Sequence, residues 1–284
     1  MTELPLVVGV DGSESSLTAV DWAVAEAARR GLTLRLVYAS LWERYEGALP
    51  SGSRERPSEQ VMAEHIVASA AERARHRAPD VRTTTAILPR EAADALLQEG
   101  DEAFAVVTGA RGRGPIKGLL LGSVGLSVAA RAQCPVVVVR GDRAGLAGTH
   151  GRVLLGAGDP DTGGEAVRFA LQEAEARGCV LDVVRAWRCP APESADRPRH
   201  EQQAEEVLDA LLRGVTAGPP GVRVQRTTLE GTARKVLLDR SAAADLVVIG
   251  ARRRPSRFGL QLGRVAHTLL HHAQCPVAVV PHRV

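Results

Sequence analysis

Aromatic residues are scarce in this chain of 284 residues, at 3% of the sequence. With so few aromatic rings, the surface has little on which bases could stack, which disfavours nucleic acid as a partner. Lysine is also rare: only two of the 36 basic residues are lysine, so 34 are arginine. Because the net charge is only +3, we interpret the arginine excess as a bias of GC-rich codons rather than a nucleic-acid footprint.

Long apolar runs are absent, and none approaches the roughly 20 residues that would cross a bilayer. The N-terminal stretch MTELPLVVGVDGS has no basic region, no long apolar segment and no small-residue cleavage site, so it does not resemble a secretory signal. Four cysteines form neither a disulfide framework nor a paired CxxC metal site. We therefore expect a soluble cytoplasmic protein, no membrane partner, and cysteines that serve as small core residues.

The sequence contains an internal repeat. Residues 5–37 align with residues 152–184 at an offset of 147, and RAQCPVVVV at 131–139 aligns with HAQCPVAVV at 272–280 at an offset of 141. We predict two domains of one fold, 1–141 and 151–284, joined by the glycine-rich linker 141–151.

Within each copy, short apolar runs alternate with helical patterns, which indicates an α/β fold with a parallel sheet covered by helices. The expected strands of the first copy are 6–10, 32–39, 82–88, 104–108 and 135–139. The expected helices are a first one capped by Ser15 or Ser16 and ended by Gly31, then 59–78, 91–100 and 122–132. The aperiodic segments 40–57 and 188–199 are predicted to be loops over the carboxyl ends of strands, where they could act as lids.

A glycine-rich stretch, GARGRGPIKGLLLGS at 109–123, follows the fourth strand. Gly109 and Gly112 permit a close backbone approach, and Gly122 with Ser123 opens a helix whose free N–H groups and dipole favour an anion. The stretch also contains the basic residues Arg111, Arg113 and Lys117. This combination predicts a loop that holds phosphates by backbone amides and positive charge.

The pattern G-x-x-G-x9-G-[ST], preceded by VVGVDGSESS and followed by CPVVVV, resembles the ATP-binding class of the universal stress protein family over both halves of the chain. The resemblance implies tandem Rossmann-like domains of the adenine nucleotide alpha hydrolase type, each with five strands in the order 3-2-1-4-5. It further implies that the N-terminal domain binds an adenine nucleotide, ATP with Mg²⁺, at the carboxyl edge of its sheet. The residues that match the family's site are Gly9, Val10, Asp11, Val37, Gly109, Arg111, Gly112, Gly122, Ser123 and Val124.

The resemblance also implies roles for these residues. Asp11 binds the ribose or adenine side, Val37 contacts the adenine, and the glycine loop wraps the ribose and phosphates. Arg90 and Ala92 occupy positions where the family usually has glycine and proline. This difference from the family pattern affects no residue that contacts the ligand.

The second copy departs from this pattern. Gly158, Arg253 and Arg264 replace Asp11, Gly112 and Ser123, although Asp159 follows Gly158. Since an arginine side chain prevents a close backbone approach, we expect one nucleotide site, in the N-terminal domain, and a degenerate second site. Alternatively, the arginines at 252–254 and 264 bind a smaller or more anionic ligand, or form a solvated rim.

The resemblance implies that the last strand pairs between subunits, so the C-terminal domain is expected to be an intrachain pairing partner, with a homodimer also open. We favour a nucleotide-responsive stress module that is not an enzyme. Slow Mg²⁺-dependent ATP hydrolysis and a nucleotide-free dimeric scaffold remain alternatives. Ser123 is interpreted as a helix cap rather than a nucleophile, His267, His271 and His272 as surface residues, and Asp21 as an exposed helix charge.

Overall fold

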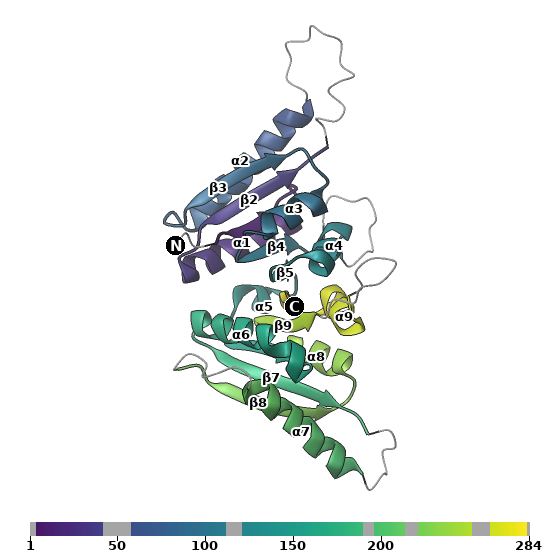
Figure 1. The fold of residues 1–284 in the computed structure, drawn as a ribbon. Helices are drawn as coiled ribbons and strands as arrows, with labels where there is room; N and C mark the ends of the chain where they lie inside the picture. The colour runs from purple at the N-terminus through teal and green to yellow at the C-terminus, as the bar shows by residue number, and fades with distance from the viewer. Residues whose placement is uncertain are drawn as a thin grey trace. The chain divides into compact units, whose positions relative to one another are not determined.

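The computed structural model describes residues 4–41, 58–111, 121–189, 196–213, 221–251 and 262–282 (Figure 1). The chain divides into two compact units, Met1–Val139 and Arg140–Val284. Each is described by itself below.

The N-terminal unit has five strands in the described residues, all parallel, in the order β3-β2-β1-β4-β5. This is the order that the resemblance implies. The elements are β1 (Leu6–Gly9), α1 (Glu14–Arg30), β2 (Leu34–Ala39), α2 (Ser58–Arg77), β3 (Thr83–Leu88), α3 (Ala92–Gly100), β4 (Ala105–Gly109), α4 (Ser123–Arg131) and β5 (Val136–Val139).

The C-terminal unit repeats this topology, with the described strands parallel in the order β8-β7-β6-β9-β10. Its elements are α5 (Arg143–Ala147), β6 (Arg152–Gly156), α6 (Pro160–Arg177), β7 (Val180–Trp187), α7 (Arg197–Arg213), β8 (Val224–Glu230), α8 (Ala233–Ser241), β9 (Leu246–Ala251), α9 (Arg264–His272) and β10 (Val277–Pro281).

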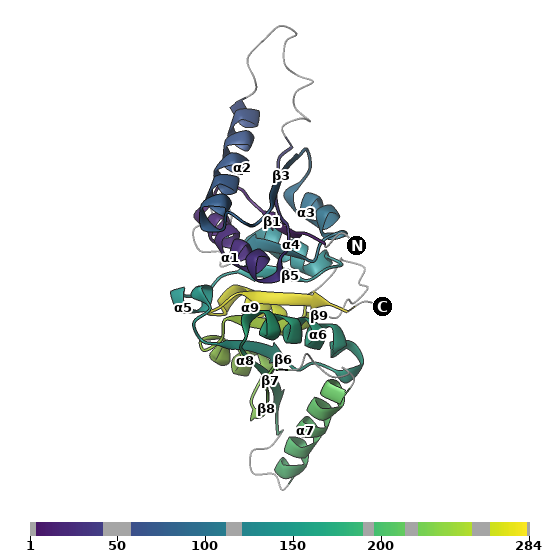
Figure 2. The ribbon, with the colours of Figure 1, turned by 90° about the vertical axis from the view of Figure 1, so that its left-hand side faces the viewer.

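Helices cover both faces of each sheet, so the central strands are buried on both sides. In the N-terminal unit α1 and α2 lie on one face and α3 and α4 on the other, and in the C-terminal unit α6 and α7 face α8 and α9 across the sheet (Figures 1 and 2). Burial on both faces explains why these strands are continuous valine and leucine runs instead of alternating patterns. No helix among the described residues is both long and apolar enough to span a membrane.

Helix α1 begins earlier than the sequence pattern suggested. We expected Ser15 or Ser16 as the N-cap, but the helix starts at Glu14 and the Ser13 hydroxyl oxygen accepts the Ser16 N–H at 3.2 Å. At the other end Gly31 has φ +69°, a left-handed conformation that glycine adopts without strain, and it ends the helix as predicted.

Asp21 is not the exposed helix charge that we expected. Its side chain is 16% exposed and forms ion pairs with Arg73 and Arg77 of α2, each at 2.6 Å. These contacts hold α1 and α2 together on one face of the sheet. Helical spacing alone places Asp21 on a polar stripe and does not show that α2 packs beside it.

The expected linker contains structure and packs against the C-terminal unit. Asp142 caps the short helix α5 by accepting the Gly145 N–H at 2.8 Å, and the Asp142 N–H donates to the Gln274 carbonyl at 2.9 Å. Arg140 donates hydrogen bonds to the carbonyls of Leu270 and Ala273. The segment after β5 therefore belongs to the second unit rather than being a free connection.

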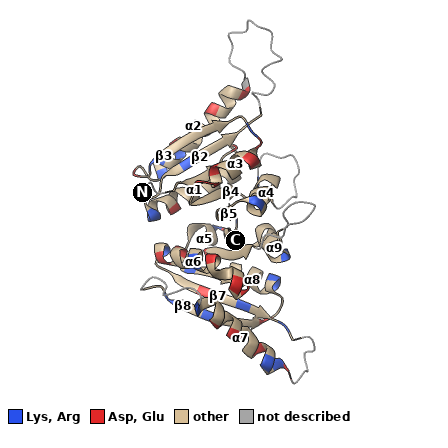
Figure 3. Ribbon diagram, viewed as in Figure 1, with Lys and Arg blue, Asp and Glu red and all other residues tan. Residues whose placement is uncertain are grey.

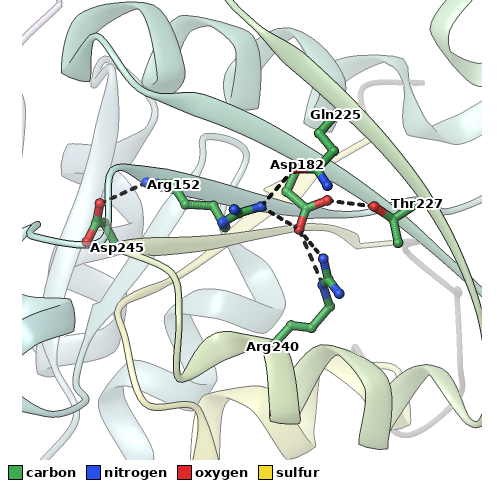
Figure 4. Close-up of polar contacts among 6 residues, drawn as sticks. All are labelled: Arg152, Asp182, Gln225, Thr227, Arg240 and Asp245. Atoms are coloured by element: carbon green, nitrogen blue, oxygen red, sulfur yellow. Dashed lines mark hydrogen bonds and ion pairs between the residues drawn. The ribbon is translucent and has the colours of Figure 1, made fainter.

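Each unit has an ion pair between its second strand and the helix after its third strand, and the positions of the two charges are exchanged between the units. Arg35 on β2 binds Glu99 on α3, with Nη2 to Oε1 at 3.0 Å, and this hydrogen bond raises the pKa of the guanidinium. The same two positions of the second unit, at offsets of 147 and 141, hold Asp182 on β7 and Arg240 on α8, joined at 2.8 Å (Figure 4).

The reversal predicts that the first pair can be exchanged as a unit. Arg35→Glu or Glu99→Arg alone puts like charges together and should lower the free energy of unfolding by about 1 kcal/mol, since both groups are partly solvated. The double variant restores an ion pair and should return to within about 0.5 kcal/mol of the wild type. Urea unfolding of the four proteins measures this, and losses that simply add in the double variant would contradict it.

Candidate functional site

The carboxyl edge of the N-terminal sheet brings together the first residues of the predicted site. Gly9 ends β1, and the next residue, Val10, donates its N–H to the Val37 carbonyl at 2.9 Å. A Cβ built on Gly9 would lie 2.8 Å from the end of the Leu96 side chain of α3, which would have to move to admit it. Val37 is almost fully buried, so it contributes its backbone and not its side chain to this edge.

Asp11 lies in the turn between β1 and α1. One of its carboxylate oxygens, Oδ1, accepts the Ser13 N–H at 2.9 Å and the Ser13 hydroxyl at 2.6 Å. Gly12, between them, has φ +76°, which lets the chain reverse so tightly. The turn thus fixes a half-buried carboxylate at the edge of the sheet, beside the first turn of α1.

Gly109 at the end of β4 forms the closest approach of backbone segments at this edge. A Cβ built on Gly109 would lie 2.6 Å from both the carbonyl oxygen and the hydroxyl of Ser15, a distance that real side chains do not adopt. The Ser15 hydroxyl also accepts the N–H of Arg111 at 3.1 Å. Residues far apart in sequence thus hold the start of the glycine loop against α1.

Helix α4 supplies the other end of the loop. Gly122 is its N-cap and donates its own N–H to the Ala110 carbonyl at 2.8 Å, while no side-chain hydrogen bond caps the helix in the described structure. Ser123 is the exposed first residue of the helix, not its cap as we expected, and Val124 is half-buried. Gly112 lies outside the described residues.

Thr108 is a site feature that we did not predict. Its hydroxyl is buried and has no hydrogen-bond partner among the described residues, and it lies 3.2 Å from where a Cβ on Gly125, in the first turn of α4, would stand. The signal was available as a polar residue in the apolar strand AVVTG, where the second copy has Ile249. A buried hydroxyl under an uncapped helix start suits an anionic ligand.

The chemical groups at this edge suit those of a nucleotide. Among the described residues, no group of three or more His, Cys, Asp or Glu side chains is placed to hold a metal ion. The edge instead offers the Asp11 carboxylate on one side and the backbone N–H groups at the start of α4 on the other. A carboxylate suits the hydroxyl donors of a ribose, and free amides suit phosphate oxygens.

The equivalent edge of the C-terminal unit has a different shape. Asp159, not a serine, caps α6 and accepts the Asp161 N–H at 3.2 Å. A Cβ on Gly250, the counterpart of Gly109, would meet nothing closer than Ala166 at 3.6 Å, so the close approach of the first unit is missing. Arg264 is the exposed first residue of α9, whereas Arg253 lies outside the described residues.

Two of the three histidines of α9 are surface residues, as expected. His267 and His272 are exposed, but His271 is half-buried, and its ring stacks on His267 with centroids 4.3 Å apart. Burial, together with the neighbouring positive groups, lowers the pKa of His271.

Three of the four cysteines are buried, Cys134, Cys189 and Cys275, in agreement with core residues. Cys179 is half-buried. Burial raises the pKa of the Cys275 thiol far above its ordinary value, so this residue is an unreactive thiol.

Comparison with known proteins gives the same result for both halves of the chain. A sequence model of the universal stress protein family matches at residues 5–140 and again at 149–281. Universal stress protein Rv1996 of Mycobacterium tuberculosis is 30% identical over 303 residues, which cover 98% of this chain and 95% of that protein.

Among solved structures, a universal stress protein from Archaeoglobus fulgidus has a TM-score of 0.63 at 18% identity and covers 98% of both chains, which shows the fold. A second protein from that organism, in complex with dAMP, covers 49% of this chain and all of its own, with 26% identity and a TM-score of 0.38. The family model matches each of the two repeats, and the relative from Mycobacterium tuberculosis aligns along nearly the full length of the chain. The chain belongs to the universal stress protein family.

Proposed function

We propose that the N-terminal unit binds ATP with Mg²⁺ at the carboxyl edge of its sheet. The observation that carries this proposal is the contact of Gly109 with Ser15, which would be lost with any side chain at position 109. The start of α4, like that of α9, has no side-chain cap, and the buried Thr108 hydroxyl has no hydrogen-bond partner among the described residues, whereas the second unit has Ile249 at that position. Together they favour a bound anion.

The nucleotide would be oriented by residues on either side of this contact. Asp11 would accept hydrogen bonds from the ribose, and the backbone next to Val10 and Val37 would face the base. The amides that follow Gly122, together with Arg111 and Gly112, would hold the phosphates. Mg²⁺, when bound, would neutralise phosphate charge.

We infer that the nucleotide is a signal and not a substrate for turnover. The polar side chains described beside the Gly109 contact are engaged in holding α1: Asp11 binds Ser13, and Ser15 binds the backbone of Arg111. Occupancy of the site would change the surface that the unit offers to protein partners. We propose that the chain acts in this way as a regulatory stress module in the cytoplasm.

The C-terminal unit would serve mainly as a pairing partner of the first. Nucleic acid is not an expected partner, since α1, α2, α6 and α7 each carry acidic as well as basic residues (Figure 3).

The test is isothermal calorimetry of ATP with Mg²⁺ on protein stripped of copurified nucleotide. We expect one site per chain. Two sites would show that the arginine-substituted edge also binds, and no heat with a folded protein would contradict nucleotide binding and favour a scaffold.

A variant connects the binding to the glycine loop. Gly112→Arg, which copies the second repeat, should abolish ATP binding and leave the melting temperature near that of the wild type, because it adds a side chain to the loop and not to the core. Calorimetry and thermal denaturation measure the two quantities on the same sample. Unchanged ATP affinity would mean that this loop does not hold the phosphates.

A further inference from the structure

Arg185 lies across the carboxyl edge of the C-terminal sheet. It belongs to β7 at the position that Tyr38 has in β2, at the offset of 147. Its Nη1 donates hydrogen bonds to two successive backbone carbonyls beyond β6, those of Ala157 at 3.1 Å and Gly158 at 2.9 Å. A side chain from one strand thus caps the exit of its neighbour.

The two carbonyls are at positions equivalent to residues of the proposed nucleotide site in the first unit. Ala157 and Gly158 correspond to Val10 and Asp11, and the backbone is held in the same way, since the Ala157 N–H donates to the Val184 carbonyl at 2.8 Å. The strand ends therefore match, and the difference lies in what covers them. In the C-terminal unit a guanidinium takes the acceptors that border the nucleoside position of the proposed N-terminal site.

Hydrogen bonds and a neighbouring negative charge stabilise the guanidinium at this position. A ligand could use these carbonyls only through its own donors, such as an exocyclic amino group or a ribose hydroxyl, and would have to displace two charge-assisted hydrogen bonds. The contact is partly withdrawn from water, since Arg185 is half-buried, and this burial lowers the pKa of its guanidinium against the opposing effect of Asp159. Asp159 is the N-cap of α6, so its negative charge is fixed beside the arginine.

We propose that Arg185 determines the nucleotide stoichiometry of the chain, because it occupies the C-terminal edge as a built-in substitute for a ligand and excludes nucleosides from it. The sequence comparison assigned the loss of the second site to positions 158, 253 and 264 only. The proposal rests on nucleotide binding by the N-terminal unit, and one of its two tests is independent of that binding.

The first test uses Arg185→Ala in the full chain and guanidinium chloride at low millimolar concentration. Removal of the side chain leaves both carbonyls without their donor, so the variant should melt below the wild type and recover part of the difference with guanidinium but not with equal sodium chloride. Arg185→Lys, which keeps a cation on the strand, should gain nothing from guanidinium. A gain no larger for Arg185→Ala than for the wild type would overturn the proposal.

The second test moves the arginine into the competent unit. Tyr38→Arg should weaken ATP binding by about tenfold or more, since the guanidinium can reach the Val10 and Asp11 carbonyls. Tyr38→Lys and Tyr38→Leu control for charge and for loss of the ring, and melting curves confirm folding. Wild-type affinity in Tyr38→Arg, or an equal loss in Tyr38→Lys, would overturn the proposal. If the wild type binds no ATP, the proposed function fails, and the guanidinium titration still decides the place of Arg185.

Discussion

Asp182→Asn should lower the free energy of unfolding of the C-terminal unit by about 3 kcal/mol. The Asp182 side chain is fully buried, and its Oδ2 accepts hydrogen bonds from Arg152 at 3.1 Å and from Arg240 at 2.8 Å. Its Oδ1 accepts the Thr227 hydroxyl at 3.1 Å (Figure 4). One carboxylate therefore links β6, β7, β8 and α8.

The expected loss is large because the variant leaves two guanidinium groups facing each other without a counter-charge. Breaking a buried pair from one side costs about 3–5 kcal/mol, mostly because the remaining charge is uncompensated. We expect the lower end of that range, because Arg152 and Arg240 are each 32% exposed and water can solvate part of their charge. Asparagine keeps the volume of the side chain, so no cavity adds to the effect.

Chemical denaturation followed by circular dichroism measures the effect, and Glu165→Gln is a matched control in the same unit. Glu165 pairs with Arg168 on the surface of α6, with 34% and 51% of the side chains exposed, so its loss should change stability by at most about 0.5 kcal/mol. An Asp182→Asn protein as stable as the control would show that the buried carboxylate is not what links the strands.

Gly109→Ala should weaken ATP binding by about ten- to a hundredfold and reduce stability by about 1–3 kcal/mol. The methyl group would stand 2.6 Å from the Ser15 carbonyl oxygen, which is backbone and cannot rotate away. Either the end of β4 or the first turn of α1 must shift. Since Arg111, at the start of the loop, is hydrogen-bonded to the same serine, the shift would displace the loop.

The second unit provides the control at the equivalent position. Gly250→Ala would place its methyl group 3.6 Å from the nearest atom, an ordinary contact with Ala166. It should leave ATP binding unchanged and alter stability by at most about 0.5 kcal/mol. Equal effects of the two substitutions, measured by calorimetry and denaturation, would mean that the contact with Ser15 is not what the glycine preserves.

The outline of the molecule was predictable because it depends on local patterns. The continuous apolar runs show strands buried on both faces, the helical runs between them require parallel connections, and the repeat at offsets of 147 and 141 gives the second unit from the first. Gly31 ends α1 where the sequence indicated. The segment 141–151 was misjudged, because Gly141 and Gly145 lie close against Gln274 and Cys275, which are distant in sequence.

The sequence by itself determined the family, the number of repeats and the glycine pattern that follows the fourth strand, since these depend on residue types at fixed spacings. Only the tertiary structure decided what those residues touch. It placed Ser15 against Gly109, buried the Thr108 hydroxyl with no partner in the described part of the chain and laid Arg185 over the exit of β6. The contacts of Gly109 and Arg185 join elements that are separated along the chain, and the direction of a side chain across a sheet edge depends on packing rather than on periodicity.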